Sequence, residues 1–168
     1  MDPKVALVTA TNLPVPDPES HLVVEALAAL GVPAAIRAWS DPWPWEKTPL
    51  VVLRSPWDYH KRLDEFLAWA ERVSRATRLL NPFSVVSWNA RKGYLLDLES
   101  RGVPVVPTRL LRAGTAVDRE GLRAVGEELV VKPAVAAGAY RSRVRRQAIS
   151  PAAEQHVDSI ICDPSQPG

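Results

Sequence analysis

The sequence is short of the residues that build disulfide frameworks and metal clusters. Cys162 is its only cysteine, so neither an intrachain disulfide nor a site of several cysteine ligands can form. The three histidines, His21, His60 and His156, are too far apart in sequence to show metal-ligand spacing. These shortages disfavour a zinc enzyme, and a single cysteine fits a reducing cytoplasm.

Long apolar runs and an excess of charge are also lacking. No apolar stretch is long enough to span a bilayer, and the N-terminus shows no apolar segment followed by a small-residue cleavage site. The formal net charge of +2 is too small to indicate nucleic acid or an anionic membrane as a partner. We therefore expect a cytoplasmic protein that binds neither membrane nor nucleic acid.

The common catalytic and phosphate-binding motifs are absent. The sequence contains no G-x-x-x-x-G-K-[ST], G-x-G-x-x-G, G-x-S-x-G or H-E-x-x-H motif. A P-loop, a dinucleotide fingerprint, a serine hydrolase and a zinc protease are therefore poorly supported. No catalytic residue and no metal ligand is assigned.

The first half of the chain does have a regular alternation of apolar runs and amphipathic segments. Buried strands are predicted at residues 4–10, 34–38, 50–54 and 78–80, and helices at 17–30 and 61–75. Asp17 is expected to cap the first helix. The inner face of that helix is predicted to hold Leu22, Val23, Ala26, Leu27 and Leu30. Such strands, separated by helices, indicate the α/β class and a Rossmann-like parallel sheet covered on both faces.

The pattern changes in the second half. A helix is predicted at 88–101, strands at 103–108, 109–112, 129–135 and 140–146, and helices at 118–126 and 151–161. The last two strands are joined by Ala136, Ala137, Gly138 and Ala139, a short connection that favours antiparallel pairing. We expect a Rossmann-like domain at 1–106 and a smaller α+β unit at 107–168, with an unstructured tail from about 163.

Two lysines and a small-residue segment are candidates for an anion site. Lys132 is expected at the end of a strand, where its ammonium can neutralise phosphate oxygens. The segment 136–139 would let backbone N–H groups approach a phosphate closely. Lys92 could complete the clamp. Each feature also has an ordinary interpretation, as a strand-end lysine, a plain hairpin and a solvated helix lysine.

A polar and aromatic loop follows the third predicted strand. Ligands of open parallel sheets gather beyond the carboxyl ends of the strands, so this loop is placed to contact a substrate. Its candidate substrate-binding residues are Arg54, Ser55, Trp57, Asp58 and Tyr59. An aromatic corner that packs the loop against the core is an equally good interpretation.

Several segments, taken in their order and spacing, resemble an ATP-grasp ligase of the glutathione-synthetase-like type. They are Val5-Ala6-Leu7-Val8-Thr9, Leu53-Arg54-Ser55-Pro56-Trp57-Asp58-Tyr59-His60, Leu80-Asn81-Pro82, Val86-Ser87-Trp88-Asn89-Ala90-Arg91-Lys92-Gly93-Tyr94-Leu95, Gly102-Val103-Pro104-Val105-Val106-Pro107-Thr108 and Val130-Val131-Lys132-Pro133-Ala134-Val135-Ala136-Ala137-Gly138-Ala139. The nearest subgroup contains the O-ureido-serine cyclo-ligase of cycloserine biosynthesis. The resemblance runs from about residue 4 to residue 156.

The resemblance implies a function and a set of site residues. In that family the N-terminal domain helps to bind substrate, and two lysines matched by Lys92 and Lys132 contact ATP phosphates. The segment 136–139 matches a loop that folds over those phosphates. ATP and Mg²⁺ are the implied cofactors. The implied reaction forms an acylphosphate from a small carboxylate, such as an amino acid, which an amine then attacks.

The chain departs from the family pattern at several positions. Arg91 stands where an acidic residue is expected, and Ala136 replaces an expected serine. Gly93 weakens its predicted helix by about 1 kcal/mol relative to alanine. The family's adenine-contacting strand and its metal-binding carboxylates are expected beyond residue 156, so no Mg²⁺ site and little or no ligase activity are expected from these 168 residues alone.

Two alternatives stay open. One is a non-catalytic nucleotide- or phosphate-binding module. The other is a protein-interaction module, because a partial lid subdomain would leave apolar surface for a homo-oligomer or another chain to cover.

Overall fold

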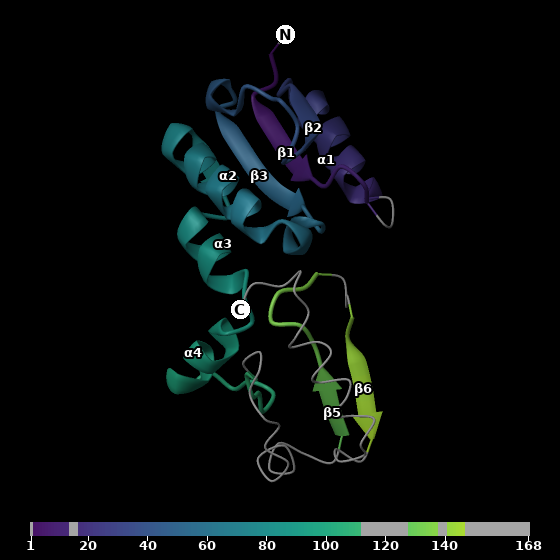
Figure 1. Cartoon of the computed structure of the whole chain (residues 1–168). Helices are drawn as coiled ribbons and strands as arrows, with labels where there is room; N and C mark the ends of the chain where they lie inside the picture. Colours follow the sequence, from purple (N-terminus) through teal and green to yellow (C-terminus); the bar gives the residue numbers. More distant parts are fainter. Residues whose placement is uncertain (1, 14–16, 112–127, 138–140, 147–168) are drawn as a thin grey trace. The chain divides into compact units, whose positions relative to one another are not determined.

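The computed structural model describes residues 2–13, 17–111, 128–137 and 141–146. The chain divides into two compact units, Met1–Ala90 and Arg91–Gly168, and each is described by itself (Figure 1). The predicted domain boundary at 106/107 lies further along the chain than the division between these units. The domain ranges 1–106 and 107–168 therefore remain a prediction.

A four-stranded parallel sheet forms the centre of the first unit (Figure 1). Its strands are β1 (Val5–Thr9), β2 (Ala34–Ala38), β3 (Leu50–Ser55) and β4 (Arg78–Leu80), in the spatial order β2-β1-β3-β4. Val5 lies opposite Ala34 on one side and opposite Leu50 on the other. The strand order therefore reverses between β1 and β3. The predicted α/β class with a Rossmann-like parallel sheet is confirmed.

Helices connect the strands of this sheet and cover its two faces. They are α1 (Pro18–Ala29), α2 (Leu63–Ala76) and α3 (Phe83–Asn89), with short 3-10 turns at Trp45–Lys47 and Tyr59–Lys61. The steps from β1 to β2 and from β3 to β4 run in opposite directions across the sheet. Right-handed crossovers therefore place α1 and α2 on opposite faces. All five residues of β1 are buried, as expected of a strand covered on both sides.

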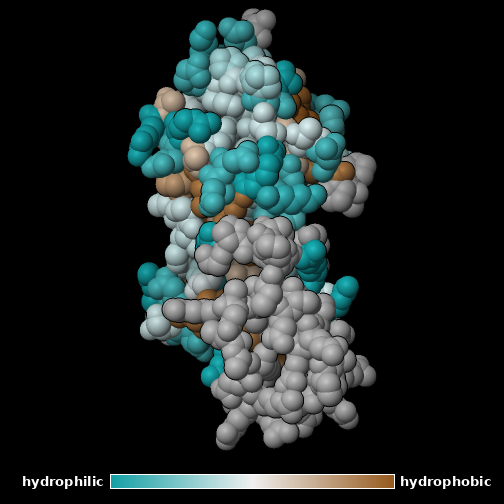
Figure 2. Space-filling model, viewed as in Figure 1, coloured by the Kyte–Doolittle hydropathy of each residue, from teal (hydrophilic) through white to brown (hydrophobic). Residues whose placement is uncertain are grey.

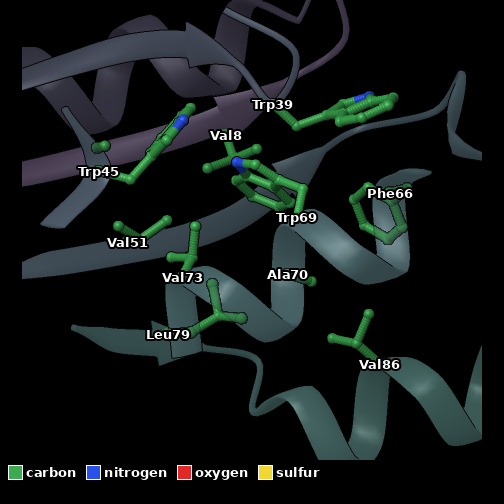
Figure 3. Close-up of a cluster of buried hydrophobic side chains, with 11 residues drawn as sticks. Val8, Trp39, Trp45, Val51, Phe66, Trp69, Ala70, Val73, Leu79 and Val86 are labelled. Carbon is green, nitrogen blue, oxygen red and sulfur yellow. The ribbon is translucent and has the colours of Figure 1, made fainter. Parts of the chain in front are cut away.

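The core on the α2 side of the sheet is dominated by aromatic side chains (Figure 3). The ring of Trp39 meets Phe66 edge-on at 5.5 Å, and Trp45 meets Trp69 edge-on at 5.2 Å. Ala70 is fully buried beneath them and leaves room for the rings. Each such pair contributes about 0.5–1.5 kcal/mol beyond the burial of its apolar area. Tryptophans from a proline-rich loop thus become the centre of the core.

Helix α1 packs differently from the predicted inner face. Ser20 is its buried residue, whereas the side chains of Leu22 and Leu30 are 62% and 77% exposed. The prediction was wrong for these two leucines and for Ala26, which is also exposed, because α1 is apolar almost all round, so periodicity cannot select the inward side. Apolar residues accordingly reach the surface among the hydrophilic ones, as seen in Figure 2. The predicted N-cap is confirmed, since the Asp17 carboxylate accepts from the N–H of Ser20.

The outer edge of β2 is covered by Arg37 of the strand itself and by Asp41 of the loop that follows it. The carbonyl of Pro33 and the N–H of Trp39 form hydrogen bonds with β1 and its end. Successive residues of a strand direct their backbone N–H and C=O groups to opposite edges, so those of the even-numbered residues between Pro33 and Trp39 point away from β1. The carboxylate of Asp41 accepts from the backbone N–H of Ala38 at 3.0 Å, and the backbone N–H of Asp41 donates to the carbonyl of Ala38 at 3.0 Å. Arg37, stacked 4.2 Å over Trp43, donates to the carbonyl of Ile36 at 2.9 Å.

The second unit contains α4 (Tyr94–Ser100), β5 (Glu128–Val131) and β6 (Arg143–Arg146). The two strands pair in antiparallel register, with Val130 opposite Val144, as predicted. The strand β5 ends at Val131 rather than at residue 135, so Lys132 directly follows the strand. The predicted helices at 118–126 and 151–161, and the tail from about 163, lie outside the described residues.

Two predictions around the start of this unit were wrong. The single helix expected at 88–101 is divided into α3 and α4, with a turn at residues 90–93 between them. Gly93 in that turn has little preference for a helix interior. The residues 103–111 form no strand, because Pro104 and Pro107 lack the N–H groups that a ladder requires. Within the described parts of the chain, no helix is long and apolar enough to cross a membrane.

Candidate functional site

A hydrogen-bonded network joins the carboxyl ends of β1 and β3, where the strand order reverses. Ser55 Oγ lies 3.1 Å from Thr9 Oγ1 and 2.5 Å from Asp17 Oδ2. The N–H and hydroxyl of Ser20 donate to the same Asp17 carboxylate, at 3.2 and 2.7 Å. Both serines are only 1% exposed. The network therefore ties two strands to the first turn of α1.

Asp17 is held as a carboxylate by these partners. The Ser55 hydroxyl is the main reason why the pKa of Asp17 lies below its ordinary value of 3.8, and the Ser20 bonds and the charge of Arg54 act in the same direction. Burial opposes them but does not outweigh them. A charged acceptor with several donors makes this corner of the sheet rigid.

Three of the five predicted substrate-binding residues point into the protein. Ser55 belongs to the buried network. Asp58 accepts from the indole N–H of Trp39 at 2.8 Å, and the ring of Tyr59 lies 5.4 Å from that of Phe66. These side chains anchor the loop, as the aromatic-corner interpretation expects.

The other two predicted substrate-binding residues are presented to solvent. Arg54 Nη2 lies 2.9 Å from Glu19 Oε2, and the two side chains are 34% and 76% exposed. Trp57 is 39% exposed, and its carbonyl is bound by His60 Nδ1 at 2.9 Å. Arg54 and Trp57 are therefore the residues of this loop that a small molecule can reach. Their role in substrate binding stays a prediction.

Sequence reasoning missed the partners of this loop. Thr9, Glu19 and Trp39 were not singled out, although each contacts a predicted residue. Thr9 ends β1, so the rule that ligands gather beyond the carboxyl ends of strands could have drawn attention to it. Glu19 and Trp39 carried no comparable sequence signal.

A second candidate site lies in the second unit, around the turn that precedes α4. The backbone N–H of Lys92 donates to the carbonyl of Ala134 at 2.8 Å, and Lys92 Nζ donates to the carbonyl of Ala136 at 3.4 Å. Lys132, which is exposed, lies near enough for its charge to act on Lys92. The structure thus brings Lys92 together with two other predicted residues, Lys132 and Ala136, from a distant part of the sequence.

Lys92 is a half-buried cation beside another cation. Burial is the main cause that lowers the pKa of Lys92, and the positive charge of Lys132 adds to it. Among the described residues, neither lysine forms an ion pair with a carboxylate. An anion placed between the two ammonium groups would therefore relieve an unfavourable interaction.

The small-residue segment is partly described. Pro133 and Val135 are buried, whereas Ala136 and Ala137 are half-buried. The remaining predicted residues, Gly138 and Ala139, lie outside the described residues. Over the parts of the chain that the structure describes, no group of three or more His, Cys, Asp and Glu residues could hold a metal ion.

Comparisons with known proteins place these features in a family context. Residues 5–81 match the N-terminal domain of the D-cycloserine synthetase DcsG. The chain is 39% identical to the cycloserine biosynthesis protein DcsG of Streptomyces lavendulae over 170 aligned positions, covering 96% of this chain and 56% of that protein. It therefore spans about half the length of this curated relative.

Solved structures agree with the sequence comparison. The crystal structure of D-cycloserine synthetase DcsG matches with a TM-score of 0.80 and 36% identity, over 94% of this chain and 55% of that one. A RimK domain ATP-grasp protein from Sphaerobacter thermophilus shares the fold, with a TM-score of 0.58 and 21% identity over 94% of this chain and 57% of its own. The chain is therefore homologous to the N-terminal portion of DcsG, and it shares the fold of a RimK domain ATP-grasp protein.

Proposed function

We propose that this chain is the N-terminal portion of an ATP-dependent carboxylate–amine ligase, in which Lys92 and Lys132 contact the nucleotide phosphates. The observation that carries the proposal is that the half-buried Lys92 bonds, through its backbone N–H and its ammonium, to the segment that follows Lys132. The polyphosphate of a nucleotide carries enough negative charge to balance both lysines. A cytoplasmic location, where ATP is abundant, is part of the same proposal.

The lysines would act on the charge of the phosphates. Transfer of the γ-phosphoryl group to a substrate carboxylate gives an acylphosphate, and attack by an amine then releases inorganic phosphate. Catalysis of such a transfer depends on position and on neutralising charge. Mg²⁺ supplies part of that neutralisation in enzymes of this reaction class. We assign none of the described residues to the metal, and the two lysines would hold phosphate oxygens.

The first unit would supply contacts to the carboxylate substrate. Arg54 offers a guanidinium at the carboxyl end of β3, and Trp57 offers an exposed ring beside it in sequence. The pair between Arg54 and Glu19 is exposed, and such pairs contribute only about 0–1 kcal/mol. A substrate carboxylate can therefore replace Glu19 at small cost. An amino-acid-like carboxylate is the proposed substrate class, consistent with the relative named a D-cycloserine synthetase.

Calorimetric titration with ATP and with inorganic tripolyphosphate tests the phosphate site. Lys132→Met should weaken the binding of both ligands about tenfold or more, because a charge-assisted bond to phosphate is lost. Lys47→Met, which removes an exposed lysine of the first unit, is the matched control and should bind like the wild type. Equal affinity of the Lys132→Met variant and the wild type would contradict the proposal.

Ligase activity is expected to be absent from these 168 residues alone. Incubation with ATP, Mg²⁺ and hydroxylamine, together with a mixture of amino acids, would trap any acylphosphate as a hydroxamate. We expect no hydroxamate above the level seen without enzyme. Its formation would show that the chain is catalytically sufficient.

An interaction module is the second candidate function. The exposed leucines of α1, Leu22 and Leu30, favour it, because large apolar side chains on one helix often mark a contact surface. Light scattering across a range of concentrations would separate the two candidates. A monomer at all concentrations that still binds tripolyphosphate would leave the ligase portion as the better function.

A further inference from the structure

We propose that Lys92 is the positioning residue for the segment 134–137, and that it fixes this segment before any nucleotide binds. The inference rests on the proposed phosphate site, because the segment is useful only if its backbone N–H groups approach a phosphate. It assigns Lys92 a task that is separate from its positive charge.

Two bonds from one residue attach the segment. The backbone N–H of Lys92 donates to Ala134 O at 2.8 Å, and the ammonium donates to Ala136 O at 3.4 Å. The two carbonyls belong to alternate residues, so both point toward the turn that holds Lys92. Between them Val135 is only 3% exposed, which anchors the segment from its other side. The segment is thus held by packing on one side and by Lys92 on the other.

Within the described residues, the ammonium of Lys92 has two N–H donors left for a ligand. It carries three N–H groups, and the bond to Ala136 uses one of them. The remaining donors can bind phosphate oxygens while the bond to Ala136 persists. Lys92 would then join the segment and the phosphate through one nitrogen atom. Ordering the segment in advance lowers the entropy loss on binding, which is the basis of pre-organisation.

Lys132 differs from Lys92 in this respect. It is exposed at the end of β5, and among the described residues it makes no bond to the segment 134–137. The pair Lys92→Met and Lys132→Met therefore separates the loss of a cation from the loss of the positioning bond. Methionine keeps an unbranched chain of similar length and removes the donor and the charge.

Hydrogen–deuterium exchange on the ligand-free chain tests the inference. Lys92→Met should raise exchange about tenfold over the amides of residues 134–137 and at the amide of residue 92, which donates to Ala134 O, because a stabilising bond is lost and the segment opens more often. Lys132→Met should leave exchange there unchanged. Lys92→Arg, which keeps a charged donor, should restore at least half of the protection. Helix α2 of the first unit should exchange at the wild-type rate in every variant, which monitors folding.

The outcomes separate the inference from the proposed function. Wild-type exchange at the amides of residues 92 and 134–137 in the Lys92→Met variant would overturn the positioning role, whatever the nucleotide affinity. So would an equal rise in Lys92→Met and Lys92→Arg, since packing alone would then explain it. Wild-type tripolyphosphate affinity in Lys132→Met would overturn the phosphate site and leave the positioning result standing. A tripolyphosphate affinity that falls more in Lys92→Met than in Lys132→Met supports the inference.

Discussion

The two units of this chain are stabilised in different ways. The first is a sheet with both faces covered and a densely packed aromatic core, and its loops are anchored by buried polar groups. In the described parts of the second unit, Pro133 and Val135 are the buried residues, and individual hydrogen bonds hold the small-residue segment. The first unit is therefore held by extensive side-chain packing, whereas in the second unit a few separate hydrogen bonds hold the backbone of the small-residue segment.

The largest expected effect is on the core of the first unit. Trp69→Ala should lower the free energy of unfolding by about 3–5 kcal/mol, because it removes a side chain that contacts Trp39, Trp45 and Phe66. Urea unfolding followed by circular dichroism measures the loss. Leu30→Ala, at an exposed site, should change stability by less than about 0.5 kcal/mol. Similar losses in both variants would contradict the aromatic core.

The buried network should give the next largest effect. Asp17→Ala removes the cap of α1, leaves the Ser20 hydroxyl without its acceptor and leaves Thr9 as the acceptor for Ser55, so we expect a loss of about 2 kcal/mol in the free energy of unfolding. The lowered pKa of Asp17 determines how this contribution to stability depends on pH. The contribution of the carboxylate is present above about pH 3.8 and is lost as pH falls through the lowered pKa.

Acid titration of stability checks this sign. The difference between wild type and Asp17→Ala should be constant near neutral pH and should shrink only at acidic pH. Glu25→Gln, at an exposed position of the same helix, is the control and should show no such change. A difference that grows on acidification would show that the network does not favour the charged form.

A smaller gain is expected in the second unit. Gly93 has a helical backbone, with φ of −55°, and a Cβ built there would lie 3.7 Å from Leu110 Cδ1, an ordinary contact. Gly93→Ala should therefore stabilise the start of α4 by about 0.5–1 kcal/mol. Hydrogen exchange of α4 measures the gain. Faster exchange in the variant would show that the turn needs glycine for another reason.

The smallest expected effect concerns alkaline pH. The pKa of Lys92 is lowered from its ordinary value of 10.5, so the unfolded chain binds more protons than the folded chain between the two pKa values. Stability should therefore rise with pH across that window. The slope should be missing in Lys92→Met, as measured by urea unfolding between neutral pH and pH 10.5. An equal slope in both proteins would assign the effect to other groups.

The first unit was predictable from sequence wherever burial alone decides structure. Consecutive apolar residues identified all four strands, and a capping aspartate with a following proline located α1. The inward face of α1 was not predictable because apolar residues surround that helix. The packing of Trp39, Trp45 and Trp69 depends on contacts between distant segments, which periodicity does not report.

The candidate site residues were likewise predictable from sequence only in part. Lys92 and Lys132 were candidates from their positions in the sequence and from a family resemblance, and the structure bonds Lys92 to the segment that follows Lys132. The bond from Lys92 to Ala136 and the pair between Arg54 and Glu19 are contacts across 44 and 35 residues of sequence. No local pattern encodes such contacts. The prediction of one helix at 88–101 missed the break between α3 and α4, because Gly93 was expected to weaken a continuous helix and not to interrupt it.

The covered edge of β2 has a consequence for assembly. Open strand edges recruit strands from other molecules, and proteins avoid this by blocking the edge with charged groups. Here Asp41 and Arg37 occupy three backbone groups that a fifth strand would need. A second copy that paired with β2 as a further strand would first have to break those hydrogen bonds. Its backbone would then lie against the charged side chains of Asp41 and Arg37. Growth of the sheet into a shared or fibrous structure is therefore opposed at the β2 edge.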